Sequence, residues 1–315
     1  MPDIVAIGEI LVEMMGERIG QTFLEPGKFN GPFPSGSPAI CIDQVARLGV
    51  SCGMIGRVGA DDFGTLNLNR LKQDGVDISQ ISTDESRTTG IAFVCYDEAG
   101  GRRFLYHFAE SAAGFLLPEM VSESFLSQAK ILHISGCSLL ASPHLLHSIE
   151  KAAEYARRRK ITISFDPNVR PELMKGREVK DVFQRILLDS SILLTSEKEI
   201  CLAAGCSSVD EAVSVLRRET KIIVLRSGTN PIRVYYGDSV EEISPFPVKE
   251  VDPTGAGDCF DGAFLAELCS GKSLRTAILT AAAAGALAVT KQGPMEGACF
   301  LPEIQRFLSY HGFSL

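Results

Sequence analysis

The sequence predicts an α/β protein built on a mostly parallel sheet that helices cover on both faces. Short runs rich in β-branched residues alternate with longer amphipathic stretches, which is typical of βαβ units. A chain of 315 residues, 45% hydrophobic and 22% charged, has ordinary globular composition and can bury a large core. These observations exclude collagen-like, coiled-coil and disordered classes. The net charge of −8 argues against a nucleic-acid partner, which requires a basic face.

The elements follow in order along the chain. Short runs rich in β-branched and other apolar residues predict buried strands at 4–7, 54–58, 131–134, 161–165, 192–195 and 222–225. Apolar residues at helical spacing predict helices at 38–48, 63–74, 143–159, 179–188, 196–204 and 210–219. The last third changes character and predicts consecutive helices at 256–269, 274–290 and 302–309.

Two segments interrupt this alternation. Ile91–Tyr96 and Phe104–Phe108 are strand-like, and the Gly-containing stretch Asp97–Gly101 between them indicates a hairpin. Residues 10–33 are rich in Gly, Pro and strand-forming residues. We expect both segments to form a small β-layer that projects from the main sheet. The alternative is a surface hairpin at the sheet edge.

The cysteines and the apolar tracts indicate the cellular compartment in which the protein is expected. Nine cysteines are scattered without a Cys-x-x-Cys pair, which favours reduced thiols in a cytoplasm. The N-terminus lacks the basic and apolar runs of a secretory signal. The longest apolar tract, Ala277–Val289, is shorter than the roughly 20 residues of a membrane span. We therefore expect a cytoplasmic protein with no membrane partner.

The most informative motif is Val251–Asp258, where an Asp and a Gly-Ala-Gly turn precede an expected helix. Glycine allows the backbone to approach a ligand closely. The first N–H groups of a helix have no partner within it and can hold an anion. Asp258 then lies in the first helical turn, where a carboxylate suits a base that takes a proton from a hydroxyl attacking a phosphate. The alternative is a plain capped helix whose glycines serve packing.

The same stretch, Asp252–Asp258, resembles the C-terminal signature of the PfkB, or ribokinase-like, carbohydrate kinases. Six further segments resemble the family in the same order: Gly8-Glu9, Ser35–Ala39, Ala46–Gly49, Gly56–Gly64, Asp166–Arg170 and Ser196–Glu199. Because the resemblance covers nearly the whole chain, residues 1–315 are expected to form one PfkB domain. The nearest branch is that of the 2-keto-3-deoxygluconate, fructose and tagatose kinases.

The resemblance implies a fold, cofactors and partners. The implied fold is a ribokinase-like, Rossmann-type three-layer α/β/α sandwich with a β-lid built from about residues 10–33 and 88–110. The implied cofactors are ATP and Mg²⁺, with a monovalent cation such as K⁺ as an activator. The implied assembly is a homodimer through the β-lid.

The resemblance also assigns residues to roles. Asp258 would be the catalytic base, and the N–H groups of Gly255, Ala256 and Gly257 would form the anion hole. The remaining assignments are substrate-binding by Glu9, Gly36, Ser37, Tyr106, Arg170 and Asp258, cofactor-binding by Ser196, Arg226, Gly228, Gly255 and Gly257, and metal-binding by Glu199. Phosphoryl transfer needs little covalent chemistry from a protein, so alignment and charge stabilisation are what these groups would supply.

Several positions depart from the family pattern. Ser196 replaces an Asn in the metal-organising motif, Pro231 replaces the second Gly of a nucleotide turn, and Ala282 stands where an adenine-side Asn is common. On the sugar side, Ile40 replaces an Asn. The stretch 106–113 carries His107 and Phe108 where 2-keto-3-deoxygluconate kinases use an Arg for the sugar carboxylate.

An acid sugar without a cationic lid partner would bury a poorly paired charge. We therefore predict an ATP-dependent kinase of a neutral ketohexose of the fructose or tagatose type. The alternatives are a 2-keto-3-deoxygluconate kinase and a non-catalytic sugar- or nucleotide-binding regulator on the same fold. A nicotinamide enzyme is disfavoured because no Gly-x-Gly-x-x-Gly follows the first strand.

Overall fold

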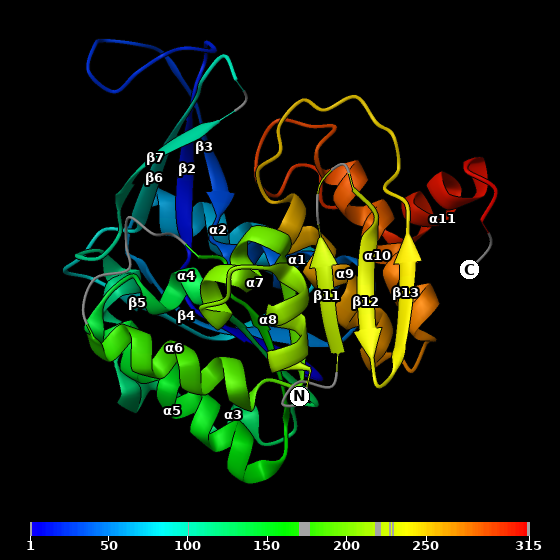
Figure 1. Ribbon diagram of the computed structural model, residues 1–315. Helices are drawn as coiled ribbons and strands as arrows, with labels where there is room; N and C mark the ends of the chain where they lie inside the picture. Colours follow the sequence, from blue (N-terminus) through cyan, green and yellow to red (C-terminus); the bar gives the residue numbers. More distant parts are fainter. Residues whose placement is uncertain are drawn as a thin grey trace.

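A nine-stranded sheet forms the centre of the computed structural model, which describes residues 2–99, 101–169, 177–217, 222–226, 228 and 230–313 (Figure 1). Its parallel strands are β1 (Ile4–Ile7), β4 (Cys52–Gly59), β5 (Asp77–Asp84), β8 (Ile131–Ser135), β9 (Thr162–Asp166), β10 (Ile192–Ser196) and β11 (Ile222–Arg226). An antiparallel hairpin, β12 (Ile232–Tyr236) and β13 (Ser239–Ile243), extends one edge. The spatial order is β13-β12-β11-β10-β9-β8-β1-β4-β5.

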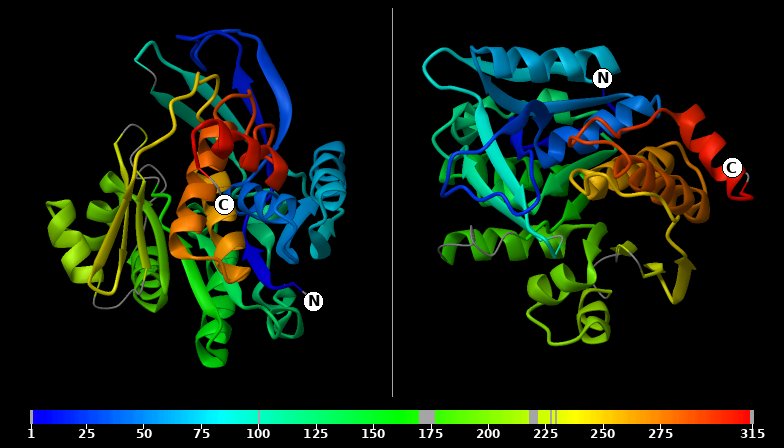
Figure 2. Two further views of the ribbon diagram at one scale, coloured as in Figure 1. Left: turned by 90° about the vertical axis from the view of Figure 1, so that its right-hand side faces the viewer. Right: turned by 90° about the horizontal axis from the view of Figure 1, so that it is seen from above.

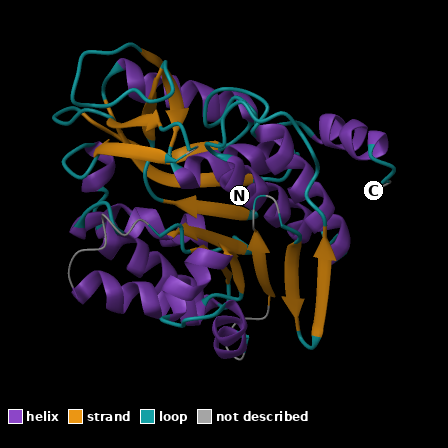
Figure 3. Ribbon diagram, turned by 45° about the horizontal axis from the view of Figure 1, so that its top comes forward, coloured by secondary structure: helices purple, strands orange, loops and turns teal. Residues whose placement is uncertain are grey.

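Helices cover both faces of this sheet, so the fold has three layers (Figure 3). One face carries α1 (Ser37–Arg47), α2 (Asp62–Asp74), α9 (Ala256–Cys269), α10 (Leu274–Ala288) and α11 (Leu301–Tyr310). The other carries α3 (Glu123–Leu126), α4 (Gly136–Leu139), α5 (Pro143–Arg159), α6 (Arg177–Asp189), α7 (Glu197–Ala204) and α8 (Val209–Leu216). Two single 3₁₀ turns, Ala112–Phe115 and Pro118–Met120, precede α3.

The alternation of side chains along each strand explains the two cores. Ile4 and Ala6 of β1 pack into the core beneath α1, α9 and α10, whereas Val5 and Ile7 pack into the core beneath α5 and α6. Successive side chains of a strand point to opposite faces, so a strand buried on both sides must be apolar throughout. This requirement produced the continuous apolar runs in the sequence, and the three-layer α/β/α arrangement that they predict is confirmed.

A second sheet stands away from the central one, and we call it the small sheet (Figures 1 and 2). It consists of β2 (Leu11–Gly16), β3 (Phe29–Ser35), β6 (Gly90–Tyr96) and β7 (Arg102–His107), in the order β3-β2-β6-β7. The segments around 10–33 and 91–108 therefore meet through the parallel pairing of β2 with β6.

Three strands of the central sheet were not predicted. β5 alternates exposed and half-buried side chains at one edge, and β12 and β13 form the other edge. Edge strands lack the two-sided burial that makes a strand continuously apolar, so their sequence signal is weak. Among the described helices, none combines the length and apolar character that crossing a bilayer requires.

Candidate active site

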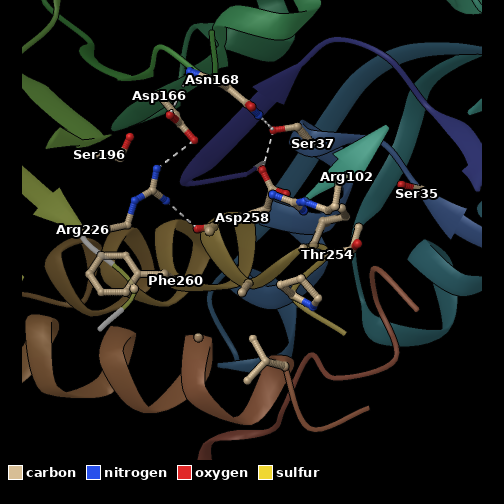
Figure 4. A pocket seen from close by; sticks show the side chains of 18 of the residues that line it. Ser35, Ser37, Arg102, Asp166, Asn168, Ser196, Arg226, Thr254, Asp258 and Phe260 are labelled. Atoms are coloured by element: carbon tan, nitrogen blue, oxygen red, sulfur yellow. Dashed lines mark hydrogen bonds and ion pairs between the residues drawn. The ribbon is translucent and has the colours of Figure 1, made fainter. Parts of the chain in front are cut away.

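A pocket of about 880 Å³ opens where the central strands end, between the small sheet and the start of α9 (Figure 4). Asp166, Ser196 and Arg226 are the last residues of β9, β10 and β11, and the parallel register sets Ser196 beside Arg226. Ligands of open α/β sheets bind beyond the carboxyl ends of the strands. The fold therefore brings these separate polar side chains together in the position expected of a ligand site.

The turn Asp252–Gly257, which leads into α9, lines this pocket and presents backbone to it. Gly255 is the N-cap with a φ of 77°, and a Cβ there would lie 2.2 Å from the carbonyl oxygen of Pro294. Only glycine satisfies both constraints. Within the described residues, no side chain caps this end of α9. The first N–H groups of the helix are thus available to an anion, with the positive end of the helix dipole behind them.

Asp258 lies in the first turn of α9, and a chain of hydrogen bonds orients its carboxylate. The Ser37 hydroxyl donates to Asp258 Oδ1 over 2.5 Å, and Asn168 Nδ2 donates to Ser37 Oγ over 3.0 Å (Figure 4). Ser37 begins α1 and Asn168 follows β9, so three separate segments position one carboxylate. Asn168 was not among the predicted site residues, although it lies in one of the quoted motifs.

Glu9 fixes the start of α1 by accepting a hydrogen bond from its first residue. Its carboxylate is 3% exposed and accepts hydrogen bonds from the Ser37 N–H over 3.1 Å, from Cys137 Sγ over 3.3 Å and from the Ser138 hydroxyl. Burial raises the pKa of Glu9, and these donors oppose that rise. Glu9 lines the pocket, and its hydrogen bonds join the start of α1 to α4.

A second carboxylate, Glu13 on β2, also lines the pocket and was missed in the sequence. It accepts a hydrogen bond from the Ser35 hydroxyl over 3.0 Å. Burial raises the pKa of Glu13 to about 7, and the nearby charges of Asp252 and Asp258 add to the rise. A signal was available, because Glu13 shares one strand face with Leu11 and Met15, which are both buried.

The small sheet contributes a row of alternating side chains from β7. Arg102, Phe104 and Tyr106 line the pocket, followed by the buried Phe108, whereas the intervening His107 is exposed. The premise that this hairpin offers no cation to the pocket is therefore wrong. The cation is Arg102, which lies outside the stretch 106–113 in which it was sought.

The opposite end of the pocket lies beneath the loop 245–248 and beside α10, where Phe246, Ala282 and Ala286 line it. Ser196 and Glu199 form a capping box at the start of α7. The Ser196 hydroxyl donates to Glu199 Oε2 over 2.7 Å, and the Glu199 N–H donates back to Ser196 Oγ. The box fixes the Glu199 carboxylate at the pocket wall.

Arg226 is engaged by protein groups rather than pointing freely into the pocket. Its guanidinium donates to Asp166 Oδ2 over 3.1 Å (Figure 4), and also to Asp261 Oδ1 over 2.5 Å and to the Gly257 carbonyl over 2.8 Å. These carboxylates raise the pKa of Arg226 against the effect of burial. Arg226 thereby ties the ends of β9 and β11 to the first turns of α9. Its direct contact with a nucleotide stays a prediction.

The carboxylates at the wall of the pocket near Glu199 suit a Mg²⁺ ion that is also coordinated by phosphate oxygens. In the described part of the chain, no three His, Cys, Asp or Glu side chains converge on a metal position. Mg²⁺ seldom needs such a cage, since it retains waters and takes one or two carboxylates together with substrate phosphates. Glu199 and Asp166 are the carboxylates at this wall that could serve it.

All the predicted site residues that lie in the described part of the chain line one pocket. They are Glu9, Gly36, Ser37, Tyr106, Ser196, Glu199, Arg226, Gly228, Gly255, Ala256, Gly257 and Asp258. Arg170 lies outside the described residues. Their individual roles toward sugar, nucleotide and metal stay predictions.

Comparison with known proteins identifies the class. The model of the pfkB family carbohydrate kinases matches residues 2–299. A structure from E. coli, described as a "putative Ribokinase II" in complex with ATP and Mg²⁺, is 42% identical with a TM-score of 0.93, covering 99% of this chain and 100% of that one. Fructokinase-1 of Oryza sativa subsp. japonica is 32% identical over 304 residues, 92% of each chain. A fructokinase double mutant from Vibrio cholerae O395, bound to fructose, ADP and potassium, is 25% identical with a TM-score of 0.85 over 98% of each chain.

The chain belongs to the pfkB family of carbohydrate kinases. It is a phosphotransferase that uses an alcohol group as acceptor, and it binds ATP. The resemblance read from the ordered motifs is thereby confirmed, and the fructokinase branch is the one supported.

The raised pKa of Glu13 predicts a pH-dependent stability. The folded protein favours the protonated form of Glu13. The stability that this preference contributes is therefore fully present below a pH of about 4.5 and is lost as the pH rises through about 7. Glu13→Gln removes this dependence. Between pH 5 and 7.5 we expect wild type to lose about 2 kcal/mol of unfolding free energy relative to the variant.

Denaturant unfolding at several pH values measures this difference. Glu154→Gln, at an exposed carboxyl on α5, is the control and should track wild type throughout. A gap between wild type and Glu13→Gln that stays constant with pH contradicts the assignment.

Proposed function

We propose that this protein transfers the γ-phosphoryl group of ATP to a hydroxyl of a ketohexose of the fructose or tagatose type. The observation that carries the proposal is the position of Asp258, one turn into a helix whose first amides are open to the same pocket. The fructokinase relatives across the length of the chain support the sugar class.

In the proposed reaction, Asp258 takes the proton of the attacking sugar hydroxyl. The new bond forms between that oxygen and the γ-phosphorus, the bond to the β-phosphate oxygen breaks, and ADP leaves. The N–H groups of Gly255, Ala256 and Gly257 would hold the equatorial oxygens of the transferring group. Mg²⁺ near Glu199, when bound, would neutralise phosphate charge.

The charges at the sugar end support a neutral substrate. Glu9, Glu13 and Asp258 offer carboxylate oxygens, which accept hydrogen bonds from sugar hydroxyls. A sugar carboxylate would meet these like charges. Arg102 is the described cation on this side, and its charge already acts on Glu13. The positive charge of Arg102 is thus partly compensated by Glu13 and is less available to attract a sugar carboxylate.

The proposal extends to the small sheet as a lid over the sugar and as a dimer surface. Its aromatic and charged side chains from β7 already line the pocket, and a cover of this kind excludes water from competing with the sugar hydroxyl.

We also place the protein in the cytoplasm, where its thiols would stay reduced. We include K⁺ as an activator because the similar fructokinase structure contains it.

The first test removes the proposed base. Asp258→Asn keeps the size of the side chain but no longer accepts a proton, so we expect kcat to fall by about 100-fold or more. Steady-state assays of ADP release with the preferred sugar measure this. Asp210→Asn, an exposed carboxylate in the first turn of α8, is the matched control and should retain full activity. Activity of Asp258→Asn within a few-fold of wild type would disprove the assignment.

The second test compares sugars. We expect kcat/KM for fructose or tagatose to exceed that for 2-keto-3-deoxygluconate by about tenfold or more, which corresponds to a difference of about 1.4 kcal/mol in transition-state binding. Arg102→Gln should lower any residual activity on the acid sugar more than activity on the ketohexose. A preference of wild type for the acid sugar overturns the substrate class. Absence of ADP release with every sugar favours a binding regulator instead.

The third test addresses assembly. β7 is an edge strand of the small sheet, and Leu105 on its outer face is 46% exposed. An unpaired edge with an exposed apolar side chain is a surface suited to a second sheet. We expect light scattering to give a dimer for wild type and a monomer for Leu105→Asp, with circular dichroism unchanged. A monomeric wild type would rule out this interface.

A further inference from the structure

One hydroxyl joins the small sheet to the turn that precedes α9. Tyr96, the last residue of β6, donates a hydrogen bond to Asp252 Oδ1 over 2.6 Å. The same hydroxyl lies 3.0 Å from Thr254 Oγ1. The partners are 156 and 158 residues apart in the chain, so the contact is a tertiary one that joins the small sheet to this turn.

Asp252 determines the shape of that turn. It is 2% exposed, and its Oδ1 also accepts the Thr254 N–H over 3.0 Å. Its Oδ2 accepts the Gly293 N–H over 2.9 Å. One carboxylate therefore fixes the turn on one side and, on the other, the loop whose Pro294 carbonyl packs against Gly255. Tyr96 supplies a third donor to this carboxylate, and it is the one that comes from the small sheet.

A second contact from the small sheet reaches the same loop. The ring of Phe33, on β3, lies so close to Gly293 that a Cβ there would come within 2.8 Å of Cδ1. The small sheet thus touches both segments that Asp252 holds, with Phe33 making an apolar contact and Tyr96 a directional one. A phenol that donates to a carboxylate makes a charge-assisted hydrogen bond, which is stronger than a neutral one.

The chemistry of Tyr96 suits a permanent donor. Burial and the neighbouring Asp252 raise the pKa of the Tyr96 hydroxyl, so it keeps its proton throughout the physiological range. The charged and titratable groups that face it are Asp252 and Glu13. Both are acidic and oppose its ionisation.

We propose that Tyr96 is a positioning residue that couples closure of the small sheet over the sugar to the shape of the anion-binding turn at the start of α9. Sugar held beneath the small sheet keeps Tyr96 on Asp252, and the turn then presents its amides in the geometry that the phosphoryl group needs. With the small sheet displaced, Asp252 loses this donor and the turn relaxes. The inference rests on the proposed kinase reaction.

The test measures coupling between the two ligands. In wild type, a saturating concentration of the best sugar should tighten binding of the non-hydrolysable analogue β,γ-imido-ATP with Mg²⁺ by about fivefold or more, in the usual range of coupling between sites. In Tyr96→Phe, which removes one oxygen, the tightening should fall below about twofold. The variant's kcat should also fall, roughly tenfold, while its affinity for the analogue without sugar stays close to that of wild type.

The matched control is Cys95→Ala, on the same strand. Cys95 is 3% exposed and packs against Gly16 on the side of β6 away from Tyr96, so this change removes buried atoms from the small sheet but leaves the Tyr96 contact. It should keep the sugar-dependent tightening even where its melting temperature falls. Calorimetric titration supplies the dissociation constants, and thermal melts report folding of each variant.

Two results would overturn the inference: tightening in Tyr96→Phe equal to that in wild type, or a wild type in which sugar leaves nucleotide affinity unchanged. Failure of the kinase proposal itself has a different signature, since wild type would then release no ADP with any sugar. A loss of tightening in Cys95→Ala as large as in Tyr96→Phe would assign the effect to general packing of the small sheet.

Discussion

The first turn of α9 depends on a close approach between two pieces of backbone, Gly255 and the carbonyl of Pro294. A side chain at 255 would need a left-handed φ of 77° and would collide with that carbonyl, so the turn can form only around glycine. Asp252 holds both segments by their N–H groups. The result is an ordered array of amides at the pocket, held in place by these contacts.

Charge balance around this array explains much of the remaining polar structure. Arg226 spreads its positive charge over Asp166 and Asp261 and also binds the Gly257 carbonyl. Within the described residues, Asp261 Oδ2 is buried without a hydrogen-bond partner, and burial raises the pKa of Asp261. The basic side chain is thus committed to supporting α9.

The part of the pocket beside the small sheet carries acidic groups. Glu9 and Glu13 are buried carboxylates whose pKa values are raised by desolvation, which disfavours adding another anion beside them. A polyhydroxy ligand can instead donate to their oxygens. The small sheet covers this region with aromatic rings of β7 and contacts the body through Tyr96 and Phe33. The small sheet therefore forms one wall of the pocket as well as a contact with the central part of the fold.

Much of the fold was readable from local sequence. The buried strands β1, β8 and β10 are apolar on both faces, and helices such as α5 and α9 begin and end within a residue or two of the expected positions, because burial on both sides and helical periodicity leave strong local patterns. The edge strands β5, β12 and β13 were missed, since half-exposed strands carry no such pattern.

The sequence by itself determined the layered α/β architecture, the glycine turn with Asp258 beside it, and the family. Each of these depends on residues adjacent or periodic along the chain. Tertiary structure alone decided that Arg102 reaches the pocket, that Asn168 and Ser37 orient Asp258, and that Tyr96 reaches Asp252. These contacts join segments more than a hundred residues apart or depend on which face of a strand meets the pocket. The packing of whole helices and strands determines these contacts and strand orientations, and no local sequence pattern encodes that packing.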